Sequence, residues 1–72
     1  MLYHMQVSQR EYQVLQLIAA EHSTNEIASK LFVSDHTIHT HRNNLLRKLD
    51  VKNTAGLVRR GFELGYLKIN QS

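Results

Sequence analysis

The segment 23–49, which reads STNEIASKLFVSDHTIHTHRNNLLRKL, holds two helix-start signals close together and constrains the fold more than any other feature. Ser23 can cap a helix, and Glu26, three residues later, can accept a hydrogen bond from the amide of the cap residue. Ser34 offers a second N-cap, and Asp35 beside it suits the positive end of a helix dipole. Two helices joined by a very short turn are the pattern of a helix-turn-helix.

The second helix of this pair, expected at about residues 35–49, carries an apolar stripe and a polar face. At 100° per residue, Ile38, Leu45 and Leu49 fall within a narrow arc, which marks the buried side. The opposite side carries His, Thr, Asn and Arg side chains and lacks Glu. A polar face of this kind, held by a short partner helix, suits the major groove of DNA.

Several stretches of the chain follow one ordered pattern. Residues 7–19 correspond to L-T-x-R-E-x-x-V-L-x-L-I-A, and residues 23–28 correspond to S-N-K-E-I-A. The pattern S-x-x-T-V-x-x-H-x-x-N-I-x-x-K-L-x-V is matched by Ser34, Thr37, Ile38, His41, Asn44, Leu45, Lys48, Leu49 and Val51. Over about residues 7–66 the chain therefore resembles the LuxR-type (NarL/FixJ) DNA-binding domain of bacterial regulators. The resemblance implies an all-α, four-helix bundle-like domain that contains a helix-turn-helix.

Length and composition limit the class of protein. Seventy-two residues allow one small domain, which we expect to span residues 1–72 with its core at about 7–66. The absence of Cys excludes disulfides and thiolate metal sites and fits a reducing cytoplasm. No signal peptide is visible, and no apolar run approaches the roughly 18–20 residues of a membrane span. We therefore expect a cytoplasmic protein without membrane contact.

Charge is distributed unevenly along the chain. Residues 1–35 hold two Lys or Arg against four Asp or Glu, a net −2, whereas residues 36–72 hold seven against two, a net +5. The positive charge gathers on and after the second helix of the motif. This is the electrostatic footprint of a phosphate-binding face, although charge alone fits a solvated basic surface equally well.

The periodicity predicts four helices and no strand, at about residues 9–21, 24–32, 35–49 and 55–64. Ser8 and Glu11 form a second capping box for the first helix. Val14, Leu15 and Ile18 form its buried stripe. Glu21 departs from the family, which usually has Gly there, so this helix is expected to run on a little or to end through His22.

The residues that read DNA are expected on the outward face of the helix at 35–49. By resemblance, the principal base-contacting positions of the family fall on His39, Thr40 and Asn43. The helical wheel also points Thr40, Asn43, His36 and Arg47 outward and places His39 at the edge. Asn pairs bidentately with adenine, Thr offers a methyl or a hydroxyl, and His donates to guanine.

The other expected DNA contacts are to phosphates. The free helix amides of Thr24 and Asn25 are expected to donate to a phosphate of the DNA backbone. The charged side chains of Arg47 and Lys48 are expected to contact phosphates as well. His41 either donates to a phosphate or, as a half-buried ring, holds its helix against the first one. Arg42 is expected to pack its stem and reach a phosphate or a carboxylate. The complete expected set of DNA-binding residues is Thr24, Asn25, His36, Thr37, His39, Thr40, His41, Asn43, Arg47 and Lys48.

The last helix, begun by Thr54 or Asn53 and ended by a left-handed Gly65, has two apolar sides. One side must cover the core. The other is expected to pair with a second copy of the chain, as the resemblance also implies, unless all of these residues belong to the domain's own core. The expected dimerisation residues are Ala55, Val58, Arg59 and Phe62.

Metal chemistry and catalysis find no support in the sequence. His36, His39 and His41 cannot converge on one ion, because His39 and His41 lie 200° apart on a helix. No Cys or acidic cluster completes a metal site. No nucleophile, base and orienting group form a set, and no phosphate loop is present. We therefore expect that the protein binds no metal and no cofactor and that it is not an enzyme.

The resemblance implies the output module of a transcription regulator, similar to phosphorylation-controlled response regulators. The expected partners are double-stranded DNA, a second copy of the chain on DNA, and RNA polymerase. One alternative is the promoter-reading segment of a sigma factor, which gives no reason for the second apolar side of the last helix. Another is a protein-interaction module that does not bind DNA, against which the charge distribution argues.

Overall fold

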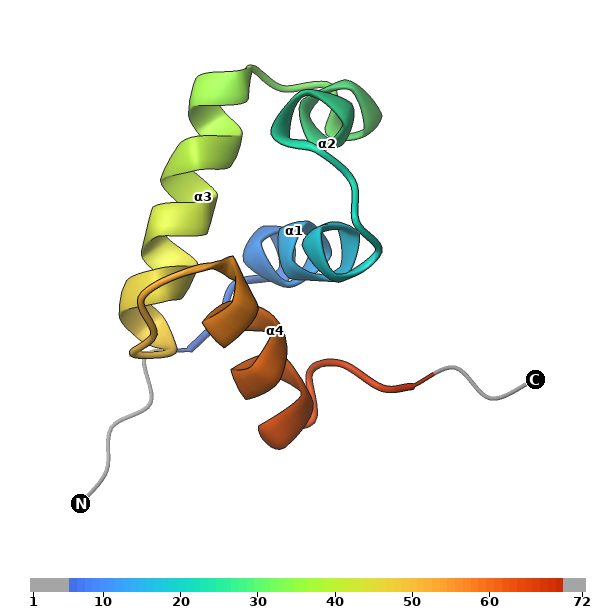
Figure 1. The fold of residues 1–72 in the computed structure, drawn as a ribbon. Helices are drawn as coiled ribbons and strands as arrows, with labels where there is room; N and C mark the ends of the chain where they lie inside the picture. The colour runs from blue at the N-terminus through green and yellow to red at the C-terminus, as the bar shows by residue number, and fades with distance from the viewer. Residues whose placement is uncertain (1–5, 70–72) are drawn as a thin grey trace.

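The computed structural model describes residues 6–69, and in this range the chain forms four helices and no strand. The helices are α1 (Gln9–Ala19), α2 (Thr24–Leu31), α3 (Asp35–Lys48) and α4 (Thr54–Glu63). Figure 1 shows α2 beside the N-terminal end of the long α3, α1 beside its middle, and α4 near its C-terminal end. The predicted all-α class with a helix-turn-helix is confirmed, and none of the described helices is long and apolar enough to cross a bilayer.

Each helix begins at a polar residue whose side chain accepts a hydrogen bond from an amide of the first turn. In the predicted capping box of α1, Ser8 Oγ accepts from the Glu11 amide at 3.1 Å, and Glu11 Oε1 accepts from the Ser8 amide at 3.0 Å. α2 has the same reciprocal pair, as predicted. The four N-cap residues are Ser8, Ser23, Ser34 and Asn53.

α1 ends earlier than the sequence predicted. The predicted boundary at Glu21 is wrong, because the helix stops at Ala19 and Glu21 adopts the left-handed conformation at φ 69°. The amide of His22 donates to Leu17 O at 3.1 Å, and the amide of Glu21 donates to Ile18 O at 2.9 Å. This pair of bonds is a Schellman motif, which Glu21 completes although it lacks the freedom of Gly.

Two more helices end on a residue other than Gly in the left-handed conformation. Phe32 (φ 59°) follows α2, so it lies outside the helix in which it was predicted, and Asp50 (φ 56°) follows α3. Each such residue costs roughly 1 kcal/mol or more relative to a relaxed backbone. Gly65 (φ 84°) ends α4 as predicted and without that cost. Phe32 is also 93% exposed, so no packing within the described residues offsets its strain.

The core lies where the four helices meet. The predicted buried side of α3 is confirmed, since Ile38, Leu45 and Leu49 are all nearly inaccessible. Ile18, predicted on the buried stripe of α1, packs half-buried against the edge of the core near the end of the helix. The buried apolar residues are Val14, Leu15, Ile27, Ala28, Ile38, Leu45, Leu49, Leu57 and Leu67.

The segment after α4 folds back onto the bundle. Gln16 on α1 donates from its side chain to Tyr66 O at 2.7 Å, and the ring of Tyr66 meets Tyr12 edge to face at 6.3 Å. Leu67 is buried above Gly61, where a Cβ atom would lie 2.6 Å from Leu67 Cδ1. Gly61 thus leaves space for a side chain from the tail, and Leu67 becomes part of the core.

Candidate nucleic-acid interface

The outward side of α3 is a continuous polar surface. Because the opposite side of the helix is fixed in the core, the side chains predicted to face outward do so. Its first turn contains the single acidic residue of the helix, Asp35, which the N-terminal end of the dipole accommodates. On α3, the exposed residues from the predicted set are His36, His39, Thr40, Asn43 and Arg47.

Two threonines of α3 have hydroxyls already engaged within the helix. Thr40 Oγ1 donates to His36 O at 3.1 Å. That bond uses the hydroxyl proton, so Thr40 presents outward its methyl group and an oxygen that can still accept. Thr37 is half-buried, and its Oγ1 lies 3.0 Å from Ser34 Oγ, so it takes part in the cap of α3. Thr37 is therefore less available to a partner than Thr40.

His41 lies half-buried between the two sides of α3, as the helical wheel placed it. Its Nδ1 atom is buried and has no hydrogen-bond partner among the described residues. A buried N–H group without an acceptor is costlier and rarer than a buried lone pair. The tautomer with its proton on Nε2 therefore leaves no buried donor unpaired. The ring then packs through its Nδ1 side and keeps the Nε2–H donor for a partner. Both roles predicted for His41, packing against the domain and donating to a phosphate, are compatible with this arrangement.

The N-terminal end of α2 has two amides without an intrahelical partner. The cap uses the amide of Glu26, which leaves those of Thr24 and Asn25. The hydrogen bond from the Ser23 amide holds the pKa of the Glu26 carboxyl below its usual value, and the nearby His22 contributes in the same direction. His22 Nδ1 lies 3.7 Å from Glu26 Oε1. The Glu26 carboxylate is thus bonded within the capping box, and the amides of Thr24 and Asn25 remain free to donate to a partner.

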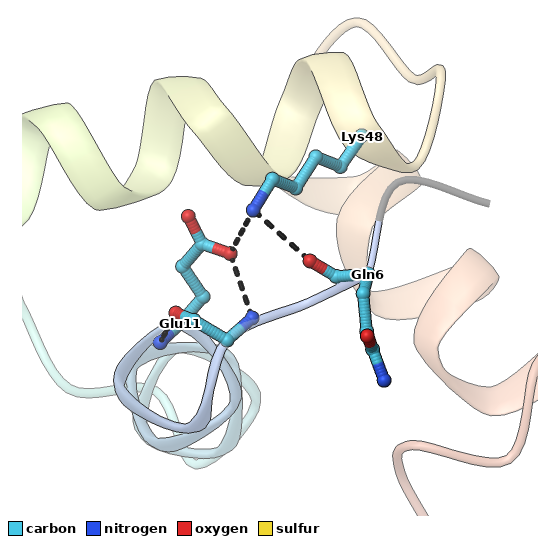
Figure 2. Close-up of polar contacts among 4 residues, drawn as sticks. Gln6, Glu11 and Lys48 are labelled. Carbon is cyan, nitrogen blue, oxygen red and sulfur yellow. Dashed lines mark hydrogen bonds and ion pairs between the residues drawn. The ribbon is translucent and has the colours of Figure 1, made fainter.

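Lys48 is engaged inside the domain rather than at its surface. Lys48 Nζ donates to Glu11 Oε1 at 2.7 Å and to Gln6 O at 3.1 Å (Figure 2). The Lys48 side chain is 17% exposed and that of Glu11 only 5%. Burial raises the pKa of the Glu11 carboxyl, but the hydrogen bonds from Lys48 and Ser8 and the Lys48 charge together hold it below its usual value.

This geometry argues against the phosphate contact expected of Lys48 and gives it a structural role. Sequence reasoning treated Glu11 only as a capping residue. The available signal was its position, because Glu11 precedes Val14, Leu15 and Ile18 by three, four and seven residues and so lies on the buried stripe. A carboxylate on such a stripe needs a partner, and Lys48 supplies it from α3. By contrast, Arg47 is exposed and forms no ion pair with another described residue.

α4 separates its two sides as the sequence predicted. Leu57 and Gly61 face the core. The predicted pairing surface is open to solvent: Val58 is half-buried, and Ala55, Arg59 and Phe62 are exposed. Arg59 pairs with Glu63 on the helix surface at 3.6 Å. Apart from Val58, which packs partly against the core, the apolar atoms of this surface remain exposed in the single chain.

The three histidines of α3 do not gather around a common point. Within residues 6–69 no set of three His, Cys, Asp or Glu side chains lies close enough to hold a metal ion. His36 and His39 instead belong to the exposed polar side, and His41 packs against the domain. His4, which the sequence also offers, lies outside the described residues.

The chain is similar to several bacterial regulators. The family model described as "Bacterial regulatory proteins, luxR family" matches residues 5–60. The uncharacterized response regulatory protein YgeK of Escherichia coli strain K12 is 39% identical over 64 residues, which cover 89% of this chain and 44% of YgeK. The transcriptional regulatory protein UhpA of the same strain is 42% identical over 57 residues, 79% of this chain and 29% of UhpA. The spore germination protein GerE of Bacillus subtilis strain 168 is 35% identical over 63 residues, 88% and 85% of the two chains.

The chain is also similar in structure to solved bacterial regulators. The transcription factor GerE superposes with a TM-score of 0.81 at 30% identity, over 85% of this chain and 91% of GerE. The response regulator ChrA of a heme-sensing two-component system superposes with a TM-score of 0.85 at 27% identity, over 92% of this chain and 33% of ChrA. The chain therefore spans most of GerE but less than half of YgeK, UhpA and ChrA.

Proposed function

Because the chain belongs to the luxR family of bacterial regulatory proteins, whose members are DNA-binding transcription regulators and not enzymes, we propose that α3 is its sequence-reading element. One observation carries this proposal: the side of α3 opposite the core presents free polar side chains. A helix held so firmly on one side and so polar on the other fits the major groove, where base edges offer donors and acceptors.

The bonds within α3 assign different chemistry to the base-reading residues. Asn43 is exposed, and its amide suits bidentate pairing with adenine. Thr40, whose proton is engaged, offers its methyl to thymine or accepts from an amino group. His39 donates to guanine N7 or O6, and His36 stands near the helix start, where base edges are most easily reached.

Phosphate contacts hold the reading helix in place. We assign them to the free amides of Thr24 and Asn25, to Arg47, and to Nε2 of His41. Thr37 stays in the proposed set as a weaker member because its hydroxyl already serves the cap. Lys48 leaves it, because its ammonium is bonded to Glu11.

The proposal extends to assembly and to the parent protein. The uncovered apolar side of α4 fits a homodimer on DNA through Ala55, Val58, Arg59 and Phe62. Such a small surface forms fully only when two half-sites hold two copies together. We take the whole of residues 1–72 as one domain that serves as the output module of a cytoplasmic response regulator and acts together with RNA polymerase. The response regulators among the relatives, of which the chain spans a part, support this view.

In-vitro selection of duplexes from a random library tests the proposal. The wild-type chain should recover a defined site with two symmetric half-sites. Asn43→Ala and Thr40→Ala should relax the preference at separate positions by roughly 1–3 kcal/mol each, with little change in melting because both residues are exposed. Unchanged preferences in both variants would remove α3 from the reading role. A single unpaired half-site would contradict the dimer, and no enrichment at all would contradict sequence-specific binding.

A further inference from the structure

Arg42 on α3 is a half-buried cation without a carboxylate partner. Its guanidinium donates from Nη2 to Thr54 Oγ1, the hydroxyl of the first residue of α4. It forms no ion pair with any residue of 6–69. Of the five N–H donors of the guanidinium, most remain unused. The free donors of this half-buried guanidinium suit an anionic partner at the same place.

Arg42 lines a surface groove bounded by residues of α1, α2, α3 and α4. Ile18, Ile27 and Ile38 give the groove an apolar lining. His22 and His39 line it together with Arg42, and Glu21 is the single carboxylate in the lining. His39 belongs both to this groove and to the exposed side of α3, so the groove adjoins the proposed base-reading surface.

The Thr54 hydroxyl gives the guanidinium a fixed orientation. Arg side chains carry much rotamer entropy, and a side chain already held loses less of it on binding. The planar fork matches the two oxygens of a phosphate bidentately, in short charge-assisted hydrogen bonds. Thr24, at the start of α2, lines the same groove and adds partial positive charge to that of Arg42.

We propose that this groove binds one phosphate of the DNA backbone, with Arg42 as the anchoring side chain and Thr54 as its positioning residue. The inference rests on the proposed function. It adds Arg42 and Thr54 to the phosphate contact already proposed for the Thr24 amide, apart from Arg47 near the C-terminal end of the reading helix. Because a phosphate carries no sequence information, the site fixes the register of α3 and contributes equally on every duplex.

The first test is fluorescence anisotropy of the 72-residue chain with the duplex recovered by selection and with a scrambled duplex. Arg42→Gln should weaken binding to both roughly tenfold or more and should lower the slope of log affinity against log salt by about 0.9 per bound domain. The matched control is Lys68→Gln, an equal loss of charge on an exposed residue that lies outside this groove. Arg42→Lys should retain the slope and regain only part of the affinity.

Thr54→Val keeps the shape of the residue and leaves the Asn53 cap intact, so it tests positioning without removing the charge. It should weaken binding less than Arg42→Gln does, with the salt slope unchanged. Circular dichroism melts identify any variant whose loss of binding comes from unfolding. If well-folded Arg42→Gln and Lys68→Gln lose affinity equally, the groove is not a phosphate site.

A second measurement separates this inference from the function on which it rests. Inorganic phosphate added to the ¹⁵N-labelled chain should shift the Arg42 Nε–H and Thr24 amide signals in the wild type and not in Arg42→Gln. If the wild type binds no duplex and these signals still shift, the proposed function fails and the anion site stands. Shifts confined to other residues, or saturation by micromolar phosphate without any effect of Arg42→Gln on DNA, would overturn the assignment to a DNA phosphate.

Discussion

The two ends of α3 carry similar polar residues but differ in what those residues can do. Over the first three turns, His36, His39 and Asn43 extend into solvent. In the last turn, Arg47 is equally free, but the adjacent Lys48 is bonded to Glu11 on α1 and to the backbone of Gln6. The first three turns are thus open to a partner, whereas the last turn has one basic residue that is free and one that is bonded to the rest of the domain.

This difference shows that a basic residue cannot be assigned a role from its charge alone. Arg47 and Lys48 are neighbours in sequence, and both suit a phosphate. They lie 100° apart on the helix, which turns one toward solvent and the other toward α1. What decides the role is the partner at that angle, and here it is a carboxylate buried on another helix.

The largest expected effect tests whether the buried side of α3 holds in place the side that we propose reads DNA. Ile38 is 1% exposed, so Ile38→Ala leaves a cavity and should lower the free energy of unfolding by about 2–5 kcal/mol. That is a large share of the stability of a small domain. Thermal melts followed by circular dichroism measure it, with Asn43→Ala on the opposite side as the control. Melting of Ile38→Ala at the wild-type temperature would mean that the reading side is held in some other way.

The next effect separates the two basic neighbours. Lys48→Ala leaves the Glu11 carboxylate buried without its cation and should destabilise the domain by about 1–3 kcal/mol, with little change in the salt dependence of DNA binding. Arg47→Ala should leave melting within about 0.5 kcal/mol and should lower the salt slope by about 0.9 per bound domain. Melts and salt titrations of both variants check this contrast. The reverse pattern would show that Lys48 leaves Glu11 to meet the DNA.

Acidification should weaken the ion pair between Lys48 and Glu11, with a smaller effect on stability than Lys48→Ala. Because the pKa of Glu11 is lower in the folded chain than its ordinary value of 4.5, the native state favours the carboxylate. Its contribution to stability is fully present above the unfolded pKa and is lost as pH falls through the folded pKa. Urea melts of the wild type between pH 7 and pH 3 should show this loss, and it should be smaller in Glu11→Gln. Equal acid sensitivity of the two would place the titrating carboxylate elsewhere.

The smallest effect concerns the helix ends on either side of α2. Phe32→Gly and Glu21→Gly remove the Cβ from left-handed residues and should each stabilise the domain by about 0.5–1 kcal/mol, net of the added freedom of the unfolded chain. A rise of a few degrees in melting temperature is the expected readout. Lys30→Gly, at an exposed position inside α2, should lower it instead. Lower melting in all three variants would show that the side chains of Phe32 and Glu21 contribute contacts that outweigh their strain.

Local signals predicted the frame of the molecule. Capping boxes and apolar periodicity located all four helices, and they identified Ile38, Leu45 and Leu49 as buried, because both signals lie within a few residues of the structure they determine. The outward direction of Asn43 and Thr40 followed from the same periodicity. The two apolar sides of α4 were also visible, since Leu57 and Gly61 lie opposite Ala55 and Arg59.

Long-range pairings could not be predicted in this way. The bond from Arg42 to Thr54 and the tie between Lys48 and Glu11 join residues on different helices, and no local spacing encodes such a partner. The early end of α1 had a different cause. Propensity gave no reason for Glu21 to adopt a left-handed conformation, yet the chain must turn there for α2 to reach α3.

Because the Leu67 side chain packs directly against Gly61, the residue tolerated at one of these positions depends on the residue at the other. A methyl group at residue 61 would occupy the space that Leu67 fills, so Gly61→Ala should be tolerated better beside a smaller residue at 67 than beside Leu. Both residues lie after the segment matched by the family model, which ends at residue 60. Homologues in which a different side chain covers this end of the bundle should therefore differ at both positions together. A fusion junction or stop codon placed before Leu67 would remove the side chain that packs against Gly61.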